Sequence, residues 1–100
     1  MNNHQEWPFD QAPDVAAFTT SQVLDLHFPI LQVTHYEDDH SWAFLCGRTD
    51  DYEKDGRLVC MSEVLNLDKT LTEVADLPPG WSASRIDKDS EWVRYVEEQD

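Results

Sequence analysis

The sequence has few basic residues, and it lacks any long apolar run. Seven Lys and Arg residues stand against 21 Asp and Glu residues, for a formal net charge of -14. Because phosphate binding depends on Lys and Arg, this balance argues against a nucleic-acid partner. No apolar stretch approaches about 18 residues, so we expect no membrane partner. The start of the chain also lacks the features of a secretory signal, and we expect a cytoplasmic protein.

The chain is too short for most large catalytic architectures. Its 100 residues form about one domain and do not suffice for a (β/α)8 barrel or a doubly wound nucleotide-binding fold. Hydrophobic residues make up 40% of the sequence, which is enough for one modest core. We therefore predict a single domain over residues 1–100, with an irregular arm at 1–13 and an acidic tail at 97–100.

The two cysteines, Cys46 and Cys60, form no CxxC motif, so their spacing fits neither a zinc site nor a redox site. We interpret them as buried free thiols in a reducing cytosol. The alternative is a cross-strand disulfide. That bond needs the two residues side by side on one face of a sheet, and the sequence does not fix their register.

Residues 30–46 contain two segments of alternating side chains on either side of a polar turn. A hairpin closed in that turn pairs Val33 with Phe44 and His35 with Trp42. The large side chains of the two strands then share one face, which supports this register. The opposite face is also too apolar for solvent, so we expect helices on one face and the termini or a partner chain on the other.

The remaining elements predict an α+β fold. We expect a small antiparallel sheet of three to four strands, its first three strands in a meander, packed with one to three short helices. Further strands are expected at residues 57–61 and 81–86, and helical segments at 22–26, 63–67 and 68–75. Residues 92–96 are expected to form a final short element. The expected core consists of Leu31, Val33, Trp42, Phe44, Val59, Leu67, Leu71 and Trp81.

The acidic charge is unevenly distributed along the chain. Residues 31–56 carry a net charge of -5, whereas residues 57–85 carry -1. One interpretation is solubility, because like charges repel one another. The other is a surface that attracts a basic protein partner, with aromatic residues of the peripheral segments as anchors. The candidate partner-binding residues are Glu37, Asp38, Asp39, Asp50, Asp51, Glu53, Trp7 and Trp92.

Catalytic and metal-binding motifs give weak signals. His35 and His40 flank three carboxylates, a set that could bind a divalent metal. A tight turn, however, splays its side chains apart. We therefore predict a solvated turn with His35 at the sheet edge. Residues 50–56 lack the ligand spacing of a calcium loop. The GxSxG, HExxH and phosphate-loop motifs are also missing. We therefore expect no catalytic residue, no metal and no cofactor.

Three stretches of the sequence carry a resemblance. They are residues 42–47 followed by an acidic loop, residues 64–68 with Leu71, and residues 76–85 with Trp92 after them. Together they resemble a group of small acidic bacterial domains, and related domains have been grouped with the immunity proteins of polymorphic toxin systems.

The resemblance covers roughly residues 30–92, and its motifs are structural rather than catalytic. It implies an α+β fold without a known active site. Three functions follow from the sequence. The leading one is a non-catalytic protein-binding module. One form of such a module is an immunity-type inhibitor of a basic partner. The alternatives are a structural or regulatory homodimer whose acidity serves solubility, and, last, a metal-dependent enzyme that uses the turn between His35 and His40.

Overall fold

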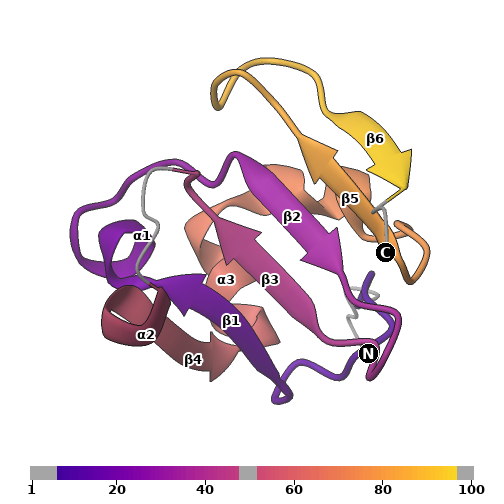
Figure 1. Cartoon of the computed structure of the whole chain (residues 1–100), viewed down its shortest axis with the longest axis horizontal. Coiled ribbons are helices and arrows are strands. Elements are labelled where there is room, and N and C mark those ends of the chain that lie inside the picture. Colours follow the sequence, from indigo (N-terminus) through magenta and orange to yellow (C-terminus); the bar gives the residue numbers. More distant parts are fainter. Residues whose placement is uncertain (1–6, 48–51, 97–100) are drawn as a thin grey trace, which may run out of the picture.

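The computed structural model describes residues 7–47 and 52–96, and within these ranges six strands form one mixed sheet in the order β4-β1-β3-β2-β5-β6 (Figure 1). The α+β class is confirmed, but the sheet is larger than the three to four strands expected. The strands are β1 (Ala16–Thr20), β2 (Gln32–His35), β3 (Trp42–Leu45), β4 (Gly56–Cys60), β5 (Trp81–Ser84) and β6 (Val93–Val96). The helices are α1 (Ser21–Asp25), α2 (Tyr52–Asp55), α3 (Met61–Leu67) and the 3-10 helix η1 (Lys69–Val74).

The central hairpin has the register that the alternation predicts. Strands β2 and β3 are antiparallel, with Val33 opposite Phe44 and His35 opposite Trp42. Strand β5 pairs with the other side of β2, and β6 pairs with β5, both antiparallel. The large side chains of β2 and β3 therefore share one face, because both strands alternate with the same period.

The predicted meander is wrong, because β4 does not pair with β3. Strand β1 lies between them, parallel to β3 at Phe18 and Ala43 and antiparallel to β4 over its whole length. The segment escapes a sequence-based prediction because its alanines have low strand propensity and its threonines also suit a helix start. Thr19 and Thr20 are fully buried, and the Thr19 hydroxyl donates a hydrogen bond to the Phe44 carbonyl.

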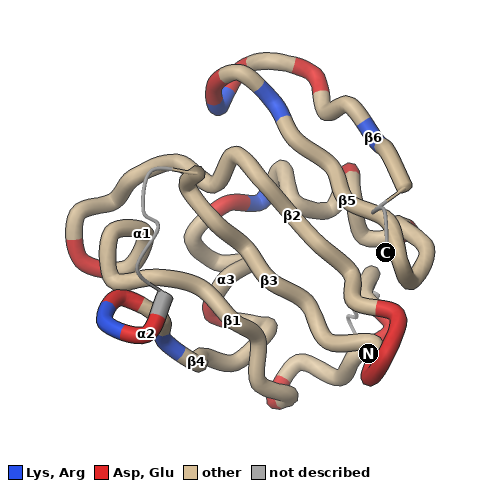
Figure 2. The backbone as a smooth tube through the Cα atoms, in the orientation of Figure 1, with Lys and Arg blue, Asp and Glu red and all other residues tan. Residues whose placement is uncertain are grey.

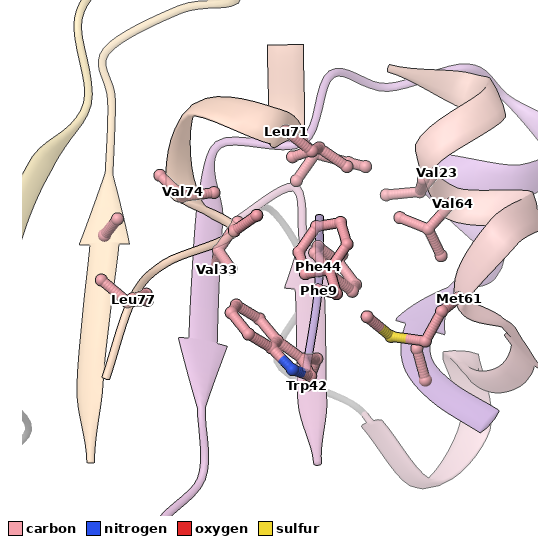
Figure 3. Packing of buried hydrophobic residues seen from close by; sticks show 14 of the residues in the cluster. Phe9, Val23, Val33, Trp42, Phe44, Met61, Val64, Leu71, Val74 and Leu77 are labelled. Carbon is pink, nitrogen blue, oxygen red and sulfur yellow. The ribbon is translucent and has the colours of Figure 1, made fainter. Parts of the chain in front are cut away.

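The core lies on the face of the sheet against which α1, α3 and η1 pack (Figure 3). Of the expected core residues, Val33, Trp42, Phe44 and Leu71 are buried, and Val59 and Trp81 pack partly buried against them. Leu31 is half-buried, and Leu67 is exposed, so the prediction for Leu67 is wrong. Its helix ends at this residue and buries Met61 and Val64 instead.

Residues 7–13 form no helix or strand, as expected of an arm, but Phe9 of this arm enters the core. Its ring lies edge-on to the rings of Trp42 and Phe44, with centroids 5.0 and 6.1 Å away. The expected acidic tail at 97–100 lies outside the described residues. In the part of the chain that is described, no helix is long and apolar enough to span a membrane.

Candidate protein-interaction surface

The face of the sheet opposite the core carries an apolar groove. In Figure 1, α3 and η1 lie behind the sheet, and no described helix lies over the front of β3 and β2. Side chains from β1, β3 and β4 point to this front, because they alternate with the core-facing residues. The groove has a volume of about 550 Å³ and is lined by Ala16, Phe18, Tyr36, Asp39, Ser41, Trp42, Leu45 and Leu58.

Apolar side chains in this groove remain accessible to solvent. Leu58 lies opposite Phe18 in the register of β1 and β4, and 72% of Leu58 is exposed. Leu45 lines the groove from β3 but is only 7% exposed, so the accessible apolar surface comes mainly from Leu58 and from Tyr36, which is 45% exposed. The composition of this face predicted a cover by the termini or a partner chain. Phe9 of the described arm packs in the core instead, and residues 1–6 and 97–100 lie outside the described residues.

The acidic turn between β2 and β3 lies at one end of the groove, where Asp39 is part of the lining. Figure 2 shows that acidic residues are gathered in this turn. Its residues Glu37, Asp38 and Asp39 are all exposed. Hydrogen bonds from the hydroxyl and the backbone N–H of Ser41 lower the pKa of Asp39 below its ordinary value. This carboxylate therefore remains ionised at neutral pH, at the point where the groove meets the turn.

The turn is anchored by neighbouring segments of the fold. The backbone N–H of Tyr36 donates to the Ser41 carbonyl at 2.9 Å, and Gln11 of the arm donates to the His40 carbonyl at 3.0 Å. His40 has a φ of 60°, in the left-handed region that few residues other than glycine adopt. The charged side chains thus project from a backbone that is held at several points.

His35 lies beneath this turn, and not at the sheet edge as predicted. It is buried in β2, which has β3 on one side and β5 on the other. Its Nδ1 lies 2.7 Å from the Leu77 carbonyl oxygen, and its Nε2 lies 3.1 Å from Oδ2 of Asp10. The ring stacks on Trp42 at a centroid distance of 4.0 Å, and the Trp42 indole donates to the other oxygen of Asp10.

The other predicted acidic residues are not gathered with this turn. Glu53 is exposed on α2, beyond the end of β3 that is opposite to the turn. Figure 2 shows basic as well as acidic residues on α2 and the start of β4, where Lys54 and Arg57 lie. Asp50 and Asp51 lie outside the described residues. The structure therefore groups Glu37, Asp38 and Asp39, and separates Glu53 from them.

The two tryptophans expected to be exposed anchors are half-buried. Trp7 packs against Phe9 with ring centroids 5.7 Å apart, and its indole donates to the Gln11 carbonyl. Trp92 lies under the guanidinium of Arg85, whose Cζ is 4.2 Å from the ring centroid. Both rings therefore support the body of the fold. The exposed groove residues Tyr36 and Leu58, and the half-buried Phe18, were not identified as site candidates from the sequence, although the apolar composition of their segments carried a signal.

Across residues 7–47 and 52–96, no three or more His, Cys, Asp or Glu side chains converge as a metal site would require. His35 faces away from the turn carboxylates, with the Leu77 carbonyl on one nitrogen and Asp10 on the other. His35 and the carboxylates of residues 37–39 therefore do not converge on a common metal site.

No protein-family model matches this chain, and no curated protein or solved structure is significantly similar to it.

Proposed function

We propose that this protein is a non-catalytic protein-binding module whose groove holds an apolar segment of a basic partner. The observation that supports this proposal is the continuity of an exposed apolar groove with an acidic turn at its end. The groove would bury apolar side chains of the partner, and the turn would attract its Lys and Arg residues. An immunity-type inhibitor of a basic toxin domain is the specific form that the sequence resemblance favours.

The apolar contribution comes from the front of β1, β3 and β4. Contiguous exposed apolar surface on a soluble domain is typical of interaction sites. Covering Leu58, with Phe18 and Leu45 beside it, removes apolar area from water and contributes roughly 1–2 kcal/mol for a side chain as exposed as Leu58. Covering this groove would thus supply much of the affinity.

The acidic turn would act mainly on the rate of association. Glu37, Asp38 and Asp39 project into solvent next to the groove, on a chain with a formal net charge of -14. Opposite charge on the partner accelerates the encounter, and this acceleration falls as salt screens the charges. Within the Asp-rich turn, Asp38 is the residue to alter, because Asp39 also accepts the hydrogen bonds that shape the turn.

Selection from a displayed library of random peptides on the immobilised full chain tests the proposal. We expect selected peptides to combine apolar residues with Lys or Arg, and to shift the NMR resonances of Phe18, Leu45 and Leu58. Leu58→Asp should weaken binding about tenfold or more. Asp38→Lys should slow association by roughly threefold at low salt. Glu91→Lys, an equal charge change at another exposed site, is the matched control for Asp38→Lys.

Selected peptides that map to another surface, or that bind Leu58→Asp as tightly as the wild type, would contradict the proposal. An Asp38→Lys variant that associates at the same rate as Glu91→Lys at low salt would leave the turn without a role in recognition. Far-UV circular dichroism of each variant verifies that the fold is retained.

A second candidate, a structural or regulatory homodimer, is favoured by strand β6. This strand lies at one edge of the sheet, and its residues Val93 and Val96 are 63% and 56% exposed. An apolar edge strand offers unpaired backbone groups to a second copy. Light scattering over a wide concentration range distinguishes the two functions. A dimer that dissociates in Val96→Lys but not in Leu58→Asp favours the homodimer, and a monomer at all concentrations excludes it.

A further inference from the structure

We propose that His35 and Asp10 form a pH-dependent latch, which holds the N-terminal arm (residues 7–13) on the sheet while the His35 ring is protonated. This inference does not depend on the groove being a binding site. The buried His35 imidazole joins two segments far apart in the sequence, and a different group faces each of its ring nitrogens.

The Nδ1 atom of His35 carries a hydrogen. It lies 2.7 Å from the Leu77 carbonyl oxygen, and a carbonyl oxygen can only accept a hydrogen bond. In a neutral imidazole the other nitrogen then has a lone pair and no hydrogen. The protonation of Nε2 therefore determines whether the ring is neutral or positively charged.

The Nε2 atom faces a carboxylate. It lies 3.1 Å from Oδ2 of Asp10, and only 3% of the His35 side chain is exposed. The other oxygen, Oδ1, accepts a hydrogen bond from the Trp42 indole at 2.9 Å. Nε2 is buried and makes no hydrogen bond in the structure, so its interaction with Asp10 is electrostatic and depends on the charge of the ring. A neutral ring places a lone pair against the carboxylate, whereas a protonated ring attracts it.

The acidic side chain in contact with the His35 ring is that of Asp10. The Glu37 carboxylate lies beside Gly80, whose backbone N–H donates to the His35 carbonyl. On the turn, the ring of His40 lies 5.9 Å away and opposes the charge on His35 when it is itself protonated. Strand β3 presents the stacked ring of Trp42, and β5 pairs Trp81 with His35. The segment after η1 presents the Leu77 carbonyl. Neither tryptophan ring nor the carbonyl titrates.

The latch connects to the arm through residues adjacent in sequence. Asp10 contacts His35 and Trp42, Phe9 enters the core, and Gln11 donates to the His40 carbonyl. The attraction to Asp10 exists only for the protonated ring, so the latch holds at lower pH and loosens at higher pH. Phe9 keeps the arm attached, so we expect the arm to loosen rather than detach.

Amide hydrogen exchange of the full chain, followed by NMR and corrected for the intrinsic exchange rate at each pH, tests the latch. Protection of the arm amides and of the Trp42 indole N–H should fall roughly three- to fivefold between pH 5.5 and 8, the size expected of a partly exposed ion pair. Amides of β3 in the same sample report global stability and should change less.

Two variants remove the latch, and two retain it. Asp10→Asn keeps an oxygen that accepts the Trp42 hydrogen bond but removes the charge, so the pH dependence should disappear. His35→Gln should do the same, and Asp10→Asn carries the test if the buried substitution unfolds the chain. His27→Asn and His40→Asn alter exposed histidines with φ near 60°, a conformation that Asn tolerates, and should keep the pH dependence.

A wild-type arm whose protection is the same at both pH values overturns the latch. Two further results do so as well: a pH dependence that persists in Asp10→Asn, and one that disappears in His40→Asn while the β3 amides remain protected.

Discussion

The guanidinium of Arg85 lies 2.7 Å from the carboxylate of Asp68, and this ion pair joins the end of β5 to the start of η1. The Arg85 side chain is 1% exposed, yet its donors have acceptors. Its Nε and Nη2 donate to the Ile30 carbonyl, and its Nη1 donates to Thr70 and to the Lys88 carbonyl. One buried side chain thus connects segments that are separated by up to 55 residues.

Replacing Arg85 should strongly destabilise the protein. Arg85→Met keeps much of the apolar length but leaves the Ile30 carbonyl and the Asp68 carboxylate without these donors. Because Asp68 is partly exposed, water can offset some of the loss, and we expect a decrease in the free energy of unfolding of about 2–4 kcal/mol. Urea denaturation of the two proteins measures the difference.

Arg57→Met is the matched control for that experiment. The Arg57 side chain is exposed and donates to the nearby carbonyls of Lys54 and Gly56, so we expect a change below about 0.5 kcal/mol. Equal losses in the two variants would mean that the buried network around Arg85 adds no stability beyond that of an exposed arginine.

The arm should be part of the folded unit because of Phe9. Phe9→Ala removes a ring that is 6% exposed and packed against Trp42 and Phe44, so we expect a loss of about 3 kcal/mol. Trp7→Ala removes a half-buried ring and should cost less. Thermal denaturation followed by circular dichroism measures both, and a smaller loss for Phe9→Ala than for Trp7→Ala would contradict this ranking.

The thiols of Cys46 and Cys60 should be free, because the topology keeps them apart. Cys46 follows β3 and Cys60 ends β4, and β1 lies between these strands. Two strand spacings amount to about 10 Å, beyond the Cα separation of a disulfide. Cys60 is half-buried rather than buried as predicted, whereas Cys46 is 1% exposed.

A thiol reagent should therefore find two reactive groups in denatured, unreduced protein. In the native protein we expect Cys60 to react before Cys46, because it is more accessible. Cys46→Ser and Cys60→Ser assign the two rates. Denatured protein without any reactive thiol would establish a disulfide and contradict the strand order.

The ion pair between Asp76 and Arg94 should make a small contribution that acid removes. The hydrogen bond from Arg94, at 2.6 Å, lowers the pKa of Asp76 below its ordinary value. A lowered carboxyl pKa in the folded state stabilises the protein above the unfolded-state pKa, which is about 3.9. This contribution is lost as the pH falls through the folded-state value.

Because Asp76 is largely exposed, we expect Asp76→Asn to cost less than about 1 kcal/mol at pH 7. The difference between wild type and variant should shrink toward zero near pH 2–3 and in about 1 M salt. Urea denaturation at both pH values measures it, with Asp14→Asn as an exposed control. A difference that grows on acidification would have the wrong sign for this pair.

Much of the local structure followed from patterns within short segments. The hairpin register was predictable because alternating side chains with period two place Val33 and Phe44 on one face only in that pairing. Residues 81–84 form a strand within the predicted segment, because the preceding Pro and Gly residues end the helical region. The acidity of residues 37–39 marked the turn at one end of the groove.

The position of β1 was decided by tertiary structure. Its residues carry a weak strand signal, and they form a strand because they fill the space between β3 and β4. The groove depends on that insertion, since Phe18 of β1 lies between Leu58 and Ala43. The sequence could show that these side chains are apolar, but not that they would lie side by side.

By itself, the sequence determined the α+β class, the register of the central hairpin and the acidity of its turn, since each depends on composition or on periodicity over a few residues. Only the tertiary structure decided the six-strand order, the exposure of the groove and the burial of His35 against Asp10. These depend on contacts between residues distant in the chain, for example 25 positions apart for His35 and Asp10. Local periodicity specifies the face on which a side chain lies, whereas packing of the whole chain specifies its neighbours.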